Sequence, residues 1–329
     1  MEDHNHTRGT NLSSRSQQIY LLSKLSTTPL SNIWESITNF FKSDEVESKT
    51  QEPQDTIRKQ LCKCPKTKNR YYCDNIHDII QMIKNTNNKR SRELYQNLLK
   101  INDTILDING DNLRQIKKDT TRTYPSNITL NQKDKIFKKL ENVLRAFSNY
   151  DKSIKYCQGM NFIVGFFLYH SEEHIAFWLF VSLIEEYDLR NVFMENFPGL
   201  KLHVKNIESI LQNEYPMYWE NFENFGIKVE IFMVEWLFSL FSCLIPLELQ
   251  IDFYKGFFSQ GWIFFYKMCI SIILNLKGKF VEADEIYIGL KIGKNDENIK
   301  EEEIKNSWKK IIQKAYIINI KTELMNINK

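Results

Sequence analysis

The chain contains few of the residues that short β structure needs, with 11 glycines and 7 prolines among 329 residues. Glycine supplies the positive φ angles of two-residue hairpin turns, so a fold with many tight hairpins is excluded. No segment shows the sustained alternation of polar and apolar residues that is typical of paired strands. The sequence therefore predicts a mainly helical protein.

The chain also lacks an uninterrupted apolar run long enough to cross a membrane, which takes about 18 residues or more. The two best candidates are residues 262–276, which contain Lys267, and residues 231–245, which contain Glu235. The polar start MEDHNHTRGT has no signal-peptide core. We therefore expect no transmembrane segment, two buried core helices in these places, and a cytoplasmic location.

No excess of charge of one sign is present, because 44 basic and 41 acidic residues give a net charge of +3. Proteins that bind nucleic acid usually carry a concentrated basic face, so we expect no nucleic-acid partner. The glycine-rich patterns GxxxxGK[ST] and GxGxxG are both missing. Since these loops hold phosphates in the common nucleotide-binding folds, we expect the chain to bind no nucleotide itself.

Four residues near the start of the helical region, Cys62, Cys64, Cys73 and His77, could supply a zinc ligand set. Their spacing is not that of a common zinc module, so unrelated thiols and a surface histidine are the preferred interpretation. Cys157 lies in an apolar segment and is interpreted as a small hydrophobe rather than a nucleophile. We expect no metal and no cofactor.

The pattern of apolar residues divides the chain into two parts. Residues 1–55 are polar and are predicted to be a largely disordered tail, with one short amphipathic segment near residues 31–41 that we expect to dock on protein. From residue 56 to residue 329 apolar residues recur at helical spacing without a repeat period. This predicts a single all-α domain over 56–329.

Two short segments carry residues suited to chemistry. The first, IKKDTTRTYP at residues 116–125, places Ile116, Asp119 and Arg122 three residues apart, on one face of a helix that reaches Arg122. Ile116 would anchor that face, and Asp119 could hold the guanidinium. Taken alone, such a pair is most often a surface ion pair.

The second segment, YCQGMN at residues 156–161, precedes an apolar run. Gly159 suits a tight turn or a close backbone approach. Gln158 would stand at the mouth of the core element with its amide free to donate and accept. Tyr156 completes the segment, and a glutamine in this position is, taken alone, most often solvated.

Together these segments resemble the paired signature of the TBC-domain family of Rab GTPase-activating proteins. The match extends from about residue 57 to the end of the chain. It departs from the family near residues 66–85, which lack its GIP turn and Arg-x-x-Trp-like motif, and at residues 253–256, which replace its Trp-Asp. Further segments resemble the family in order: residues 93–99, 176–186, 235–249, 257–262 and 308–316.

The resemblance implies a single elongated, V-shaped helical domain that accelerates GTP hydrolysis by a Rab-type small GTPase. It identifies Arg122 as an arginine finger and Gln158 as a glutamine finger, both supplied in trans and both expected to be exposed in one groove. Ile116, Asp119, Tyr156 and Gly159 resemble their supports. GTP and magnesium would be bound by the partner.

The alternative hypothesis is a TBC-like scaffold that binds a small GTPase or a trafficking partner without accelerating hydrolysis. The presence of both finger residues favours the active protein. Recruitment to vesicles or other endomembranes would be peripheral and through partners. The sequence does not identify the cognate Rab, because that choice depends on a broad complementary surface.

Overall fold

A computed structural model describes residues 92–101, 111–124, 130–276, 283–292 and 299–325. Every regular element in these ranges is helical, which confirms the predicted all-α fold class. The predicted tail at 1–55, its segment at 31–41, the domain start at 56 and the four zinc candidates lie outside the described residues.

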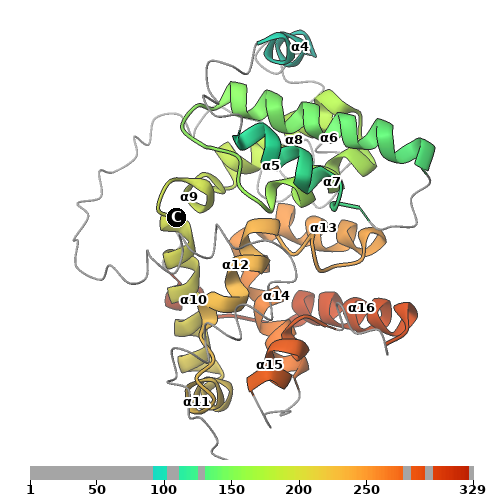
Figure 1. Cartoon of the computed structure of the whole chain (residues 1–329). Helices are drawn as coiled ribbons and strands as arrows, with labels where there is room; N and C mark the ends of the chain where they lie inside the picture. The colour runs from blue at the N-terminus through green and yellow to red at the C-terminus, as the bar shows by residue number, and fades with distance from the viewer. Residues whose placement is uncertain (1–91, 102–110, 125–129, 277–282, 293–298, 326–329) are drawn as a thin grey trace, which may run out of the picture.

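The helices fall into an upper and a lower group in Figure 1. The upper group consists of α4 to α8, and the lower group contains α10, α11 and α14 to α16, with α12 and α13 between them. In chain order the elements are α4 (Arg92–Lys100), α5 (Asp111–Thr120), α6 (Leu130–Tyr150), α7 (Met160–His170), α8 (Glu173–Glu186), α9 (Arg190–Phe193), α10 (Pro198–Glu214), α11 (Pro216–Asn224), α12 (Val229–Ser239), η3 (Leu247–Leu249), α13 (Gln250–Gln260), α14 (Trp262–Asn275), α15 (Ala283–Leu290), α16 (Glu301–Ile317) and η4 (Thr322–Leu324).

Helix α6 is the centre of the upper group, whereas the lower group has two centres, α14 and α10, the latter packing on α9, α11 and α12. In the upper group α6 packs against α4, α5, α7 and α8, and in the lower group α14 packs against α13, α15 and α16. Helix α12 contacts both groups, because it packs on α7 and α9 as well as on α10. The C-terminal end of α12 therefore lies close to the start of α7, where the second motif, residues 156–161, is found.

Helix α8 is apolar on nearly all sides, and every residue from Ile175 to Ile184 is buried. Such a helix needs neighbours around its whole circumference, and α4, α6 and α7 supply them. The sequence of this helix, EHIAFWLFVSLIEE, has no polar face along its middle, and this accounts for its deep burial. The helix ends at Glu186, earlier than its apolar run, because Asp188 adopts a left-handed backbone with φ of 59°.

Trp178 is the largest buried side chain of α8, with 1% of its surface exposed. Its ring packs edge-on against Phe177 at 4.7 Å and Tyr150 at 5.8 Å between centroids. We expect Trp178→Ala to lower the free energy of unfolding by about 3–5 kcal/mol, because the cavity has rigid aromatic walls. Chemical denaturation measures this, with Tyr169→Ala as the control, since Tyr169 is 53% exposed. Equal stability of the two variants would contradict the packing described.

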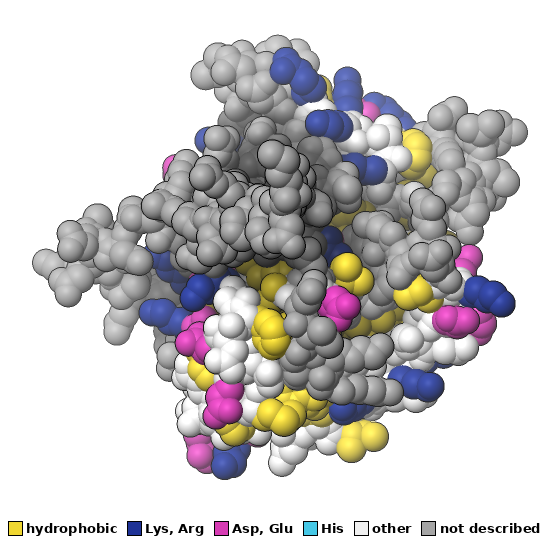
Figure 2. All heavy atoms as spheres, turned by 60° about the horizontal axis from the view of Figure 1, so that its bottom comes forward, with side chains coloured by type: hydrophobic (Ala, Val, Ile, Leu, Met, Phe, Trp, Pro, Cys, Tyr) yellow, Lys and Arg dark blue, Asp and Glu magenta, His cyan; other side chains and the backbone are white. Residues whose placement is uncertain are grey.

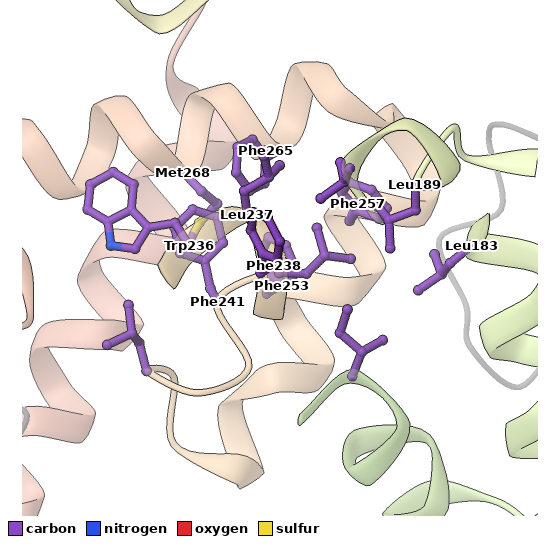
Figure 3. Packing of buried hydrophobic residues seen from close by; sticks show 14 of the residues in the cluster. Leu183, Leu189, Trp236, Leu237, Phe238, Phe241, Phe253, Phe257, Phe265 and Met268 are labelled. Carbon is purple, nitrogen blue, oxygen red and sulfur yellow. The ribbon is translucent and has the colours of Figure 1, made fainter. Parts of the chain in front are cut away.

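The same hydrophobic core continues between α12, α13 and α14, where Figure 3 shows Phe238, Phe241, Phe253 and Phe265 among its members. Leu240 and Phe241, just after α12, both have left-handed backbones, with φ of 46° and 58°. Bulky residues adopt this conformation only when packing holds them. The ring of Phe241 lies 5.4 Å from Phe253 and 5.0 Å from Phe265, and these contacts fix the turn that ends α12.

The two apolar runs considered as membrane candidates are core helices in the structure. They correspond to α12 with the turn after it and to α14, and most of their residues are buried. Within the described ranges, no helix combines the length and apolar character that spanning a bilayer takes. Pro246 directly precedes the short 3₁₀ turn η3, which leads into α13.

The four most exposed large apolar side chains of the described residues belong to separate elements: Ile317 to α16, Met217 to α11, Ile288 to α15 and Tyr169 to α7. In the lower part of Figure 2, basic and acidic side chains lie side by side with apolar ones between them. Isolated exposed apolar side chains are normal for a folded protein surface. This face therefore carries both signs of charge, in keeping with the small net charge of the chain.

Candidate functional site

The first motif ends α5 and continues into a hydrogen-bonded turn. The helix stops at Thr120, two residues before the predicted limit, but the amide of Arg122 still donates to the carbonyl of Asp119 at 3.2 Å. The hydroxyl of Thr120 donates to the carbonyl of Ile116 at 2.7 Å. Ile116 itself is buried, as predicted. The turn keeps Arg122 on the same side of the element as Asp119.

The carboxylate of Asp119 forms an ion pair with the guanidinium of Arg122. One carboxylate oxygen, Oδ1, accepts hydrogen bonds from Nε of Arg122 at 3.0 Å and from its Nη2 at 2.7 Å. Asp119 has no exposed surface, while the Arg122 side chain is 20% exposed. A buried carboxylate is tolerated only when it is paired and hydrogen-bonded, and the guanidinium meets both needs.

The same carboxylate connects the two motifs. Its other oxygen, Oδ2, accepts a hydrogen bond of 2.7 Å from the hydroxyl of Tyr156, 37 residues further along the chain. Burial, and then the charge of Asp119, raise the pKa of Tyr156 well above its ordinary value, so the phenol stays protonated and donates. The structure thus places Arg122, Asp119 and Tyr156 in one network.

Gln115 also belongs to this network, and sequence analysis did not identify it. Its side-chain amide lies 3.1 Å from both oxygens of Asp119. The signal was available, because Gln115 precedes Asp119 by four residues and therefore shares its helix face. With Gln115, Arg122 and Tyr156 as donors, the buried carboxylate is satisfied on both oxygens.

A second bridge between the motifs uses two residues to which the sequence gave no role. The side-chain amide of Asn161 donates to the hydroxyl of Thr123 at 2.9 Å, and its oxygen accepts from the amide of Gly159 at 3.0 Å. Asn161 has no exposed surface. It therefore fixes the turn before α7 and ties that turn to the segment after Arg122.

Gly159 stands where no other residue fits. Its φ of 114° is a conformation that side chains rarely adopt, and a Cβ atom there would lie 2.4 Å from the backbone oxygen of Phe238. The predicted close backbone approach at this glycine is present in the structure. It sets the last residues of the second motif directly against the C-terminal end of α12.

Gln158 differs from expectation in its exposure. The prediction that both finger residues are exposed is wrong for Gln158, of which 6% is exposed. Tyr156, Cys157 and Gly159 on either side are also buried, and the close approach of Gly159 to the backbone of Phe238 holds this part of the loop against α12. Arg122 is partly exposed, and its Nη1 is buried without a hydrogen-bond partner in the described part of the chain.

Cys157 shows no sign of a reactive thiol. Burial raises its pKa well above the ordinary value, and the charge of Asp119 acts in the same direction. A thiol in these surroundings stays protonated and packs as an apolar group. Among the residues with described positions, no group of three or more histidine, cysteine or acidic side chains could hold a metal ion.

These features define a helical domain in which one buried carboxylate, Asp119, joins an arginine at a helix end to Tyr156 in the distant loop that also carries Gln158. The sequence matches the model of the Rab-GTPase-TBC domain over residues 31–281, more than half of the chain. The chain therefore belongs to the Rab-GTPase-TBC domain family. The match begins at residue 31 and so includes the amphipathic segment at 31–41.

Curated relatives share the domain at low identity. The Rab GTPase-activating protein eat-17 of Caenorhabditis elegans is 29% identical over 188 residues, which are 55% of this chain and 21% of the relative. The GTPase-activating protein GYP5 of Eremothecium gossypii is 28% identical over 226 residues, 68% of this chain and 26% of the relative. The chain thus spans about a fifth to a quarter of the length of these relatives.

Solved structures share the fold. The Ypt/Rab-GAP domain of Gyp1p superposes with a TM-score of 0.55 at 16% identity, covering 74% of this chain and 82% of that one. The Chlamydomonas flagellar RabGAP TBC domain gives a TM-score of 0.55 at 15% identity, covering 93% of this chain and 96% of that one. These matches confirm the predicted helical TBC fold.

Proposed function

We propose that this chain stimulates GTP hydrolysis by a Rab-type small GTPase, to which it supplies Arg122 and Gln158 in trans. The names of the relatives support the class of activity, since they describe GTPase-activating proteins. The observation that carries the proposal is the position of Asp119, whose two oxygens hold Arg122 and Tyr156 at the same time. Arg122 and the loop of Gln158 are therefore joined at one place in the fold.

Arg122 would act on the charge that develops between the β- and γ-phosphates during hydrolysis. An arginine finger increases the rate by about 10³ to 10⁵, or roughly 4–7 kcal/mol of barrier. Asp119 engages Nε and Nη2, so the fork is oriented while Nη1 has no partner in the described part of the chain. Because Nη1 is buried in the free protein, the guanidinium must turn outward on docking before a phosphate oxygen of the partner can accept from it.

Gln158 would align the attacking water in place of the glutamine of the GTPase. Its side chain is buried in the free protein, so it must turn outward when the partner docks. Such side-chain changes at an interface are common on binding. Ile116, Tyr156 and Gly159 would hold the two motifs during that change, and GTP with magnesium would remain on the partner.

The burial of Gln158 favours one alternative, a scaffold that binds a small GTPase without accelerating hydrolysis. Single-turnover hydrolysis across a panel of purified Rab proteins separates the two functions. We expect accelerated hydrolysis with at least one Rab. Stable binding of GTP-loaded Rab without acceleration would show that the protein is a scaffold.

A further inference from the structure

The loop that carries Gln158 runs from the end of α6 at Tyr150 to the start of α7 at Met160. The contacts of Tyr156 and Gly159 hold its C-terminal half, as described above. Ile154, in the middle, is buried with 2% of its surface exposed. The N-terminal half, residues 151–153, lies at the surface and needs its own attachment if the loop is to have one position.

Arg190, the first residue of α9, provides that attachment. Its Nη2 donates to Oδ2 of Asp151 at 2.5 Å, and its Nη1 donates to the hydroxyl of Ser153 at 3.0 Å. The other oxygen of Asp151 accepts from the amide of Ser153 at 2.9 Å and from its hydroxyl at 2.6 Å. The guanidinium of Arg190 therefore bonds two loop residues, Asp151 and Ser153, which are also hydrogen-bonded to each other.

We call Arg190, Asp151 and Ser153 the clamp. Its two charged groups, the guanidinium of Arg190 and the carboxylate of Asp151, form an ion pair. Burial acts to raise the pKa of Asp151, but the hydrogen bonds from Ser153 and Arg190 and the charge of Arg190 outweigh it and lower the pKa below its ordinary value. The carboxylate is thus ionised at neutral pH. Charge-assisted bonds from a planar fork are short and directional, which suits them to fixing an orientation.

The base of the clamp is itself rigid. Val192 and Phe193 of α9 are buried, and the ring of Phe193 lies 5.8 Å from that of Phe238. The backbone of Phe238 also contacts Gly159 at the other end of the loop. Arg190 and Phe238 therefore connect both ends of the loop to the same packed region of α9 and α12.

We propose that Arg190 is a positioning residue for catalysis, which acts through Asp151 and Ser153 to hold the loop of Gln158. The inference rests on the proposed function of Gln158. Because the Arg190 side chain is 36% exposed, its ion pair contributes little to stability. Its effect on the reaction is larger, since small displacements of a positioning group reduce rates strongly.

Kinetics with a GTP-loaded Rab test the catalytic part. We expect Arg190→Ala to lower kcat about tenfold with little change in KM, since misplacement by about 1 Å can cost up to about 100-fold. Arg190→Lys should restore only part of kcat, because one ammonium cannot span both loop residues in the same geometry. In a Gln158→Ala background the further loss should be small, because the two residues act as one unit.

The matched control is Lys305→Ala, which breaks a surface ion-pair network with Glu248 and Glu301. It should leave kcat unchanged and should match Arg190→Ala in melting temperature. A kcat that is equal in wild type and Arg190→Ala overturns the proposal. A raised KM at constant kcat also overturns it, because Arg190 would then contact the partner directly.

Hydrogen exchange of the free protein gives an answer that does not depend on the GTPase. We expect amides of residues 153–159 to exchange at least about tenfold faster in Arg190→Ala than in wild type or Lys305→Ala, because local opening becomes easier. If no Rab is stimulated by the wild type, the proposed function fails while faster exchange still supports the clamp. Unchanged exchange in Arg190→Ala contradicts the clamp whatever the activity.

Discussion

Arg122→Ala should abolish measurable stimulation of GTP hydrolysis by a Rab that the wild-type protein activates. Loss of an arginine finger removes a factor of about 10³ to 10⁵, which brings the rate close to that of the GTPase alone. Arg122→Lys should recover little, since an ammonium is a point charge and cannot reproduce the two-nitrogen grip on Asp119. Single-turnover hydrolysis with GTP-loaded Rab measures both variants.

The fold of the variant needs its own control, because Asp119 is buried and loses its cation in Arg122→Ala. Tyr156 and Gln115 still donate to the carboxylate, so we expect the helical circular dichroism spectrum to be retained. Lys117→Ala, an exposed cation on the same helix, is the matched control and should keep full activity. Stimulation that survives in a folded Arg122→Ala protein would refute the assignment of the finger.

The fold could be predicted largely from the period and extent of the apolar residues. Helix α8 is the clearest example, because an apolar run without a polar face allows only burial on all sides. Its end could not be predicted, since the left-handed backbone of Asp188 depends on the chain that follows. The same holds for Leu240 and Phe241, whose backbones are held by tertiary packing rather than by local preference.

The candidate site was predictable in part. A spacing of three residues along one helix predicts that Asp119 and Arg122 share a face, and the spacing of four residues predicts the same for Gln115 and Asp119. The contact of Asp119 with Tyr156 joins residues 37 positions apart, and no local pattern predicts it. Asp151 and Arg190 are 39 positions apart, and no local pattern predicts their contact either.

The burial of Gln158 shows the limit of local patterns most directly. A glutamine before an apolar helix is usually solvated, yet here its neighbours on both sides are buried and carry it inward. Gly159 allows this path, because its backbone can lie directly against the carbonyl of Phe238. The exposure of one side chain thus depended on a contact with a helix that lies far along the chain.

Because Gln158 is buried in the free protein, it must be tested whether Gln158 or the glutamine of the GTPase aligns the attacking water. If Gln158 aligns the water, a Rab whose own switch glutamine is changed to leucine should still be stimulated by the wild-type protein. The leucine cannot orient water, so the only amide at the reaction centre would come from Gln158. The acceleration should remain within roughly tenfold of that measured with the unchanged Rab, since the group that positions the water would come from this protein and is unchanged.

Gln158→Ala combined with the leucine-bearing Rab should then give no stimulation, because neither protein supplies an amide to the water. Binding of the GTP-loaded Rab should persist, since most of the interface is unchanged, and a pull-down with a non-hydrolysable analogue checks this. Asn213→Ala is a suitable control, because Asn213 is an exposed residue of α10 whose side-chain amide donates to the carbonyl of Ser209 in the same helix. If the wild-type protein cannot act on the leucine-bearing Rab, water is aligned from the GTPase side, and the buried position of Gln158 is then its working position.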